Sequence, residues 1–231
     1  MKQAVSILVL GLFLAASIAV TNKIVVGESK TMEFEDAAIL FEQNATDGDV
    51  EAVLRIQAGD EGLRALKVVG PDGRIALEMG CPLPNPMGLR SFVVESPEPS
   101  DQEALRAAFP EGVYTITGES VSGGKFRSDV EMSHDLPAVV TFENPQEDAE
   151  GVPYEGLTIE WSGASGVEAY LLEIEQEETG VTLNVRLLAG TESFAVPAGF
   201  LMPDTEYVLA IGTQDGGGNS SFVEMGFVTA E

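Results

Sequence analysis

Apolar and polar residues alternate along short segments over most of the chain, which is the pattern of half-buried β-strands. The alternation is clearest at residues 50–57 in the first half and at 157–161, 170–174, 181–187 and 207–211 in the second half. Turn residues separate these segments at spacings that are typical of β-sandwiches. The pattern therefore predicts an all-β chain.

A hairpin and a short helix are expected in the first half. Asp72-Gly73 lies between two apolar segments, and this pair is a strong signal for a tight turn between antiparallel strands. Ser100 and Glu103 have the spacing of a capping box, in which each side chain satisfies a backbone N–H at the start of a helix. We therefore expect one short helix near residues 101–108.

Five residues of the second half are expected to hold a sandwich core together. Tyr207 opens an alternating strand, where a buried Tyr ring can send its hydroxyl back to the upstream backbone. Leu201 is placed to fill the same corner and Pro203 to make its turn. Trp161 and Tyr170 lie on the second and third predicted strands of this half, and both are expected in its core.

These five residues, together with Gly218-Asn219-Ser220 in the last hairpin, resemble the marks of a fibronectin type III domain. The resemblance covers roughly residues 137–231 and implies a fold and structural roles, but no catalytic residues. In the first half, Phe109 to Tyr114 followed by a Gly-rich hairpin is similar to the closing strands of bacterial immunoglobulin-like modules. The expected fold class is all-β, with two tandem β-sandwich domains, immunoglobulin-like and then fibronectin type III.

The domain organisation follows from these segments. We expect a signal peptide at 1–19, a lead-in at 20–31, an immunoglobulin-like sandwich at 32–135 and a fibronectin type III domain at 136–231. The two halves show no obvious repeat of each other at the level of sequence.

The N-terminus has the features of an export signal. Lys2 gives a basic start, residues 5–14 form an apolar run of secretory length, and small residues precede a predicted cleavage after Ala19. The alternative is an uncleaved segment that anchors the protein, which would be its only contact with a membrane. The expected location is periplasmic or secreted, as for an exported bacterial protein.

The charge of the chain limits its partners. The net charge is −26, and Arg186 is the only Lys or Arg after Pro137, which excludes nucleic acid as a partner of the second half. Glu173, Glu175 and Glu177 alternate on one face of a predicted strand. We expect this face to be the solvated outer surface of the sandwich.

Few residues are suited to catalysis or to metal binding. His134 is the only histidine and Cys81 the only cysteine, which leaves no usual zinc site, and we expect His134 to be exposed in a linker. Asn44, Asp47 and Asp49 form a Gly-containing loop of closely spaced oxygens, which suits calcium. No cofactor is expected, and calcium at this loop remains the one alternative.

The sequence points to a binding protein rather than to an enzyme. We expect an exported, non-enzymatic binding or spacer protein that acts through protein–protein contacts, with another extracytoplasmic protein as its partner. The alternatives are an accessory subunit of a secreted enzyme or envelope assembly, and a carbohydrate-binding module.

Overall fold

The computed structural model describes residues 31–81, 87–97 and 102–231. The expected signal peptide, its cleavage after Ala19, most of the lead-in, and the capping residue Ser100 lie outside the described residues. The described chain is built from β-strands with one short helix. No helix in these residues is long and apolar enough to cross a membrane.

The first sandwich is made by two sheets of the first half. One sheet has the strand order β4-β3-β6-β7, and the other contains β1, β2 and β5 in the order β1-β2-β5. The elements are β1 (Asp36–Asn44), β2 (Asp49–Gln57), β3 (Leu63–Val69), β4 (Ile75–Gly80), β5 (Ser91–Glu95), α1 (Gln102–Ala108), β6 (Gly112–Ser120) and β7 (Lys125–Met132).

The second sandwich repeats this arrangement. Its sheets have the strand orders β13-β10-β8 and β12-β11-β14-β15. The elements are β8 (Phe142–Asn144), β9 (Ala149–Val152), β10 (Thr158–Trp161), β11 (Ala169–Gln176), β12 (Val181–Leu188), β13 (Ser193–Ala195), β14 (Glu206–Gln214) and β15 (Ser220–Thr229).

Alternation along the strands produces two separate cores. On β14, for example, the side chains of Tyr207, Leu209 and Ile211 are fully buried and belong to the core of the second sandwich. On β6, Tyr114 and Ile116 are buried in the same way in the first core. Each such side chain contributes about 1.5–3 kcal/mol when it is removed from water, so these inward positions stabilise both two-layer folds.

Each sandwich also has a tyrosine corner of its own. The hydroxyl of Tyr114 donates a hydrogen bond to the carbonyl oxygen of Pro110 at 2.9 Å, and the hydroxyl of Tyr207 accepts one from the N–H of Met202 at 2.9 Å. Tyr114 lies near the start of β6 and Tyr207 near the start of β14, strands that hold the same place in the equivalent sheets β4-β3-β6-β7 and β12-β11-β14-β15, as in the tyrosine corner of immunoglobulin-type sandwiches. The expected all-β fold of tandem sandwiches is confirmed, and both sandwiches are fibronectin type III-like.

One sheet runs through both sandwiches, which the sequence did not predict. Its strand order is β12-β11-β14-β15-β1-β2-β5, and the two halves join where β1 pairs with β15 in parallel. We call this junction the seam; it pairs residues 42–44 of β1 with residues 220–222 of β15. The other end of β15 pairs with β9, so both ends of this edge are covered within the chain.

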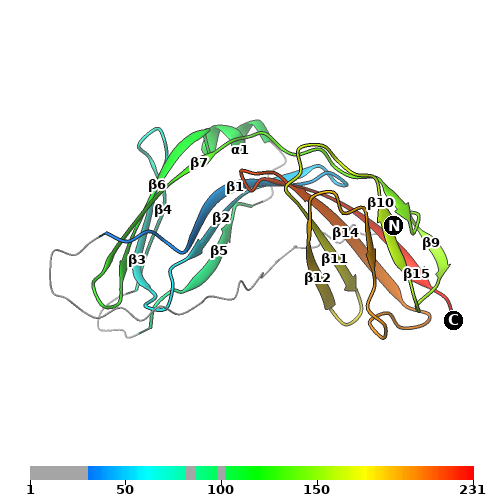
Figure 1. Ribbon diagram of the computed structural model, residues 1–231. Helices are drawn as coiled ribbons and strands as arrows, with labels where there is room; N and C mark the ends of the chain where they lie inside the picture. Colours follow the sequence, from blue (N-terminus) through cyan, green and yellow to red (C-terminus); the bar gives the residue numbers. More distant parts are fainter. Residues whose placement is uncertain (1–30, 82–86, 98–101) are drawn as a thin grey trace.

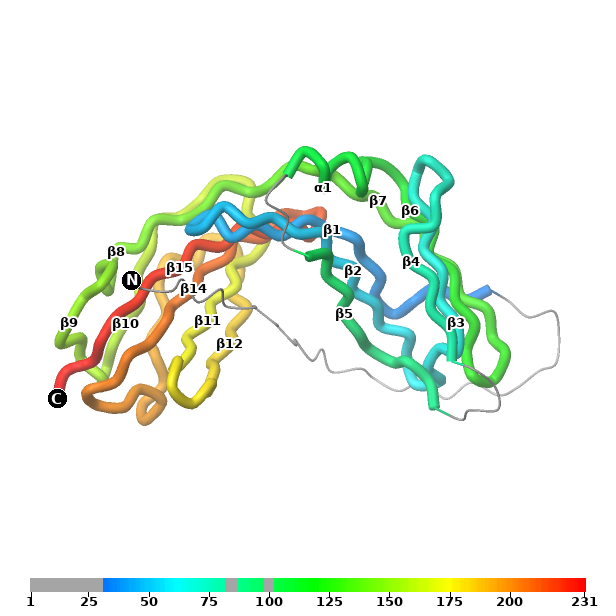
Figure 2. Tube along the Cα trace, turned by 180° about the vertical axis from the view of Figure 1, so that it is seen from behind, coloured from blue at the N-terminus to red at the C-terminus, as the bar shows by residue number. Residues whose placement is uncertain are grey.

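The shared sheet gives the molecule the shape of an arch. In Figure 1 the two sandwiches lie side by side and meet at the top of the arch, where the ends of β1 and β15 lie together. Figure 2 shows the same arrangement from behind, with β2 and β5 on one inner side and β11 and β12 on the other. The inner side of the arch therefore combines elements of both halves.

Candidate functional site

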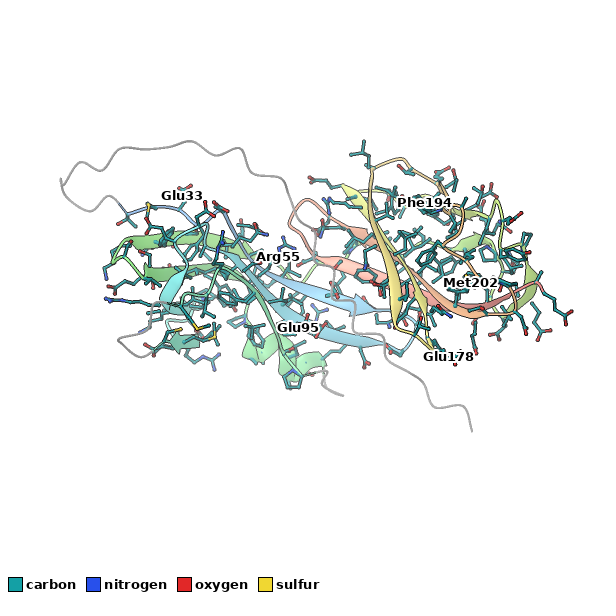
Figure 3. All side chains as sticks on the ribbon, turned by 90° about the horizontal axis from the view of Figure 1, so that it is seen from below. Glu33, Arg55, Glu95, Glu178, Phe194 and Met202 are labelled. Carbon is teal, nitrogen blue, oxygen red and sulfur yellow. The ribbon has the colours of Figure 1, made fainter. Side chains whose placement is uncertain are left out.

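A pocket opens where the two sandwiches meet. Its volume is about 460 Å³, and its lining comes from β1, β2 and β5 of the first sandwich and from β11, β12, β14 and β15 of the second. This size lies within the range of small ligand sites. Figure 3, a view from below, places Arg55 and Glu95 of this lining toward the middle of the molecule, with Glu178 farther along the second sandwich.

Asn219 is the main polar link of the seam. Its side-chain oxygen accepts a hydrogen bond from the N–H of Phe41 at 2.8 Å, and its amide nitrogen donates to the carbonyl oxygens of Ser133 at 3.0 Å and Asp135 at 2.7 Å. The residue is only 3% exposed. One side chain of the second sandwich thus satisfies backbone groups of β1 and of the connecting segment.

Further bonds continue the seam along β15. The N–H of Ala45 donates to the carbonyl oxygen of Phe222 at 2.8 Å, and the N–H of Glu224 donates to the hydroxyl of Thr46 at 2.8 Å. These bonds extend the pairing beyond the three register pairs of the sheet. The walls of the pocket are therefore fixed relative to one another.

Apolar side chains form the centre of the pocket. Phe222, Leu40 and Val53 are buried and line it together with Leu171, although they lie on the face of the sheet that points away from the sandwich cores. Gly212 lies directly across from Phe222, and a Cβ on Gly212 would collide with the Phe222 ring. The glycine therefore lets the aromatic ring lie flat against the sheet.

Glu173 corrects the expectation of a solvated outer face on β11. This residue is only 5% exposed and lines the pocket. Glu173 and Glu224 both lie opposite Ala210, on either side of β14. Periodicity assigned Glu173 to the outer face, but the bend at the seam turns that face into a wall of the pocket.

Burial raises the pKa of Glu173 to about 7, and the carboxylates of Glu175, Glu224 and Glu42 add to the increase. No hydrogen bond or ion pair to the Glu173 carboxyl occurs within the described residues. Removing a charge from water without a partner disfavours the ionised form, which is the cause of this increase.

Glu42 brings a second perturbed carboxyl to the pocket, from the other side of the seam. Burial raises its pKa to about 7 and the carboxylate of Glu95 adds to this, whereas the hydroxyl of Ser220 and the guanidinium of Arg55 lower it. The Ser220 hydroxyl donates to a Glu42 carboxyl oxygen at 2.9 Å. Glu42 therefore differs from Glu173 in having a neutral hydrogen-bond donor.

The five predicted structural residues lie together around the second core. Trp161 and Tyr170 are buried with ring centroids 5.7 Å apart, and the Tyr170 hydroxyl accepts a bond from the N–H of Ala164 at 3.0 Å. Leu201 is buried near Tyr207, and Pro203 is exposed in the turn before it. None of these residues lines the pocket.

The loop expected to suit calcium is a set of turns. The side-chain oxygen of Asn44 accepts from the N–H of Thr46 at 3.0 Å, and that of Asp47 accepts from the N–H of Asp49 at 3.2 Å. These bonds account for Asn and Asp at the two positions without an ion. No group of three or more His, Cys, Asp or Glu suited to a metal ion occurs in the described parts of the chain, and calcium binding remains a prediction.

The expectation of an exposed His134 is wrong. Its ring is half-buried, lies edge-on to Phe41 at 4.8 Å between centroids, and has Nε2 2.7 Å from the carbonyl oxygen of Phe109. The backbone N–H of His134 donates to Glu111 at 2.7 Å. The connecting segment is therefore packed against the first sandwich, and His134 stabilises this packing.

Sequence reasoning missed the pocket because its parts are far apart in the chain. The sequence places Asn219 in the last hairpin, and nothing local indicates its hydrogen bond to the N–H of Phe41, 178 positions away. One signal was available in the sequence: Phe222 and Leu171 fall on the outer face of their strands, where alternation calls for polar residues. Apolar residues on such a face indicate that something covers it.

Comparisons with known proteins give fold likeness alone. No protein-family model and no curated protein matches the sequence. Among solved structures, the chain is similar to a segment of two fibronectin type III domains from chicken tenascin, at 17% identity and a TM-score of 0.32, over 85% of this chain and 99% of that one.

A second similar structure is bacterial. The chain matches the fibronectin(III)-like modules of Clostridium thermocellum CbhA at 9% identity and a TM-score of 0.35, over 88% of this chain and 92% of that one. At these values the matches carry no functional argument. The strand orders and the two tyrosine corners described above identify the chain as a tandem of fibronectin type III-like sandwiches.

Proposed function

We propose that this chain is an exported, non-enzymatic binding protein that contacts another extracytoplasmic protein through the pocket at the seam. The observation that carries the proposal is that both sandwiches contribute walls to one pocket with an apolar centre and a charged rim. A spacer would need only two stable domains, whereas a pocket built by two domains is suited to recognition.

The fixed seam supports binding rather than mere spacing. Asn219 and the parallel pairing of β1 with β15 hold the walls before any partner arrives. A site that is already ordered avoids the entropic cost of ordering it on binding. Sandwiches of this architecture occur in many cell-surface domains, which agrees with a role outside the cytoplasm.

Two finer assignments belong to the same proposal. Within its fibronectin type III-like strand order, we propose that the first sandwich is related to bacterial immunoglobulin-like modules through its 109–114 motif, in which Tyr114 makes the corner. We also propose cleavage after Ala19 and a periplasmic or secreted location. Intact mass and N-terminal sequencing of the protein recovered from cell fractions test the export step; a retained residue 1–19 segment in a membrane fraction would contradict it.

Site-specific photo-crosslinking tests the binding function. A benzophenone amino acid replaces Leu171 in the pocket or, as a control, exposed Val181 near the tip of the β11–β12 hairpin. In the native envelope, we expect position 171 to give one discrete crosslinked protein that position 181 does not give. Crosslinking at neither position, or equally at both, would overturn the proposal.

A further inference from the structure

Glu173 is a charged group without a partner in the place where a partner could reach it. Only 5% of its surface is exposed to solvent, and it lines the pocket. Buried carboxylates in folded proteins are normally paired with a cation or with hydrogen-bond donors. No such pairing of Glu173 occurs among the residues that the structure describes.

The cations of the pocket itself are engaged elsewhere. Arg55 donates to Asp36 at 2.8 Å, and Arg186 donates to the side-chain oxygen of Gln214. Neither arginine lowers the pKa of Glu173, although both line the pocket. No Lys or Arg of the part of the chain that the structure describes is therefore paired with Glu173.

The surroundings of Glu173 specify the shape of that cation. Leu171, Leu40 and Phe222 give the pocket an apolar centre beside the acid, and Glu42 adds a second acid from the opposite sandwich. An ammonium or guanidinium on an aliphatic stem fits both parts, because the stem can cover apolar surface while the charged end pairs with carboxylates. A bare metal ion would leave the apolar surface uncovered.

We infer that the pocket at the seam binds a lysine or arginine side chain of the partner protein, with Glu173 as the paired acid and Glu42 as the second. This inference rests on the proposed binding function and names what the pocket recognises. The net charge of −26 would draw a basic segment of a partner toward the protein from a distance.

Binding should release a proton and should depend on pH. A bound cation favours ionised Glu173, so the affinity rises as the pH passes upward through the pKa of about 7 of the free protein. For this one carboxyl we expect about a tenfold gain in affinity between pH 6 and pH 8. The charged groups that lie near it on the packed strands are Glu175 on β11, Glu224 on β15, Glu42 on β1 and Arg186 on β12.

The test is an NMR titration of the isotope-labelled protein with acetyl-Ala-X-Ala-amide peptides, where X is lysine, arginine or norleucine. Norleucine keeps the stem and removes the charge. We expect the lysine and arginine peptides to shift amide signals of residues 171–175 and 40–42 with saturation in the millimolar range, and norleucine to leave them unchanged. Equal shifts with norleucine would overturn the inference.

Matched variants locate the effect. Glu173→Gln should weaken binding of the lysine peptide at least tenfold and reduce its pH dependence to the part that Glu42 contributes. Glu178→Gln makes the same charge change in the β11–β12 hairpin and should alter affinity less than twofold. Glutamine has nearly the same shape as glutamate, so Glu173→Gln keeps the packing. Equal losses in the two variants would mean general attraction to an acidic surface and would overturn the inference.

Two further outcomes separate the levels of the argument. If spermidine displaces the lysine peptide at lower concentration and through Glu173, the pocket takes free polyamines and the assignment to a partner side chain is wrong. If the peptides fail to bind while position 171 still crosslinks a discrete protein, the binding function stands and the cation inference falls. If the peptides bind but position 171 gives no crosslink, the cation inference stands and the proposal of a protein partner is wrong.

Discussion

Two equivalent sheets, β4-β3-β6-β7 of the first sandwich and β12-β11-β14-β15 of the second, show opposite outer faces. On the first, acids are paired with cations: Lys125 on β7 lies 2.7 Å from Glu119 on β6, and Arg127 lies 2.8 Å from Asp129 on the same strand, β7. On the second, Glu173 and Glu224 lie on either side of Ala210 without a cation between them.

The electrostatics of the two faces differ accordingly. The Thr115 hydroxyl and the Arg127 guanidinium lower the pKa of Asp129, which is a solvated and paired acid. Burial raises the pKa of Glu173 and of Glu224. The same strand order therefore gives one face whose acids are solvated and paired and another face whose acids are buried without a cation. The seam causes this difference, because it covers the second face with the other sandwich.

The largest expected effect comes from opening the seam. Asn219→Ala removes three hydrogen bonds, one buried and two partly buried, and leaves the N–H of Phe41 without an acceptor, so we expect a loss of about 4 kcal/mol in the free energy of unfolding. Urea denaturation measures it, with exposed Asn184→Ala as the control. The pKa of Glu173 should also fall toward its ordinary value in carboxyl NMR. A Glu173 that keeps its raised pKa in Asn219→Ala would show that the seam does not cause the burial.

The next effect concerns the unpaired acid and the dependence of stability on pH. Because folding raises the Glu173 pKa from 4.5 to about 7, the folded state holds the proton more tightly, and this contribution to stability is lost as the pH rises through that window. Glu173→Gln should therefore stabilise the protein at pH 8 by about 2 kcal/mol, less than the full shift would give because solvent in the pocket screens the charge. Denaturation at pH 5 and pH 8 measures this, and Glu178→Gln should show no such change.

A smaller and equal effect is expected at the two corners. Tyr114→Phe removes the hydrogen bond that the hydroxyl donates to the carbonyl oxygen of Pro110. Tyr207→Phe removes the hydrogen bond that the hydroxyl accepts from the N–H of Met202. Each variant should lose about 1 kcal/mol in the free energy of unfolding. The urea midpoints of the two variants can be compared directly. A large effect at one corner alone would mean that the sandwiches are not equivalent in this feature.

The smallest effect is expected on the paired face of the first sandwich. Asp129→Asn removes the charge that Arg127 contacts at 2.8 Å on an exposed surface. Solvent and salt screen such pairs, so the urea midpoint should not change beyond the error of the measurement. A clear loss of stability would show that the exposed charges of the first sheet matter more than its solvated geometry indicates.

The sandwich fold could be predicted because its signals are local. Alternation along each strand identifies inward residues such as Ile211, and the distance from Leu201 to Tyr207 identifies a corner, within a few residues of sequence. The short helix α1 likewise lies in the stretch where capping-box spacing predicts one.

The pocket could not be predicted in this way. Alternation shows on which side of a strand Glu173 lies, but it does not show what the other half of the chain places against that side. The parallel pairing of β1 with β15 joins segments 178 positions apart, and its three register pairs leave no periodic trace in the sequence. The half-buried position of His134 could not be predicted for the same reason, since its contacts with Phe41 and Phe109 depend on tertiary packing.

The pairing of β15 with β1 at one end and with β9 at the other has a practical consequence for work with fragments of the protein. A fragment that began near residue 136 would keep β9 against one end of β15 but would leave residues 220–222 with bare backbone donors and acceptors. Open strand edges recruit other chains. Truncation should therefore yield self-associating material, and full-length protein with point substitutions is the sounder route to separating what each half contributes.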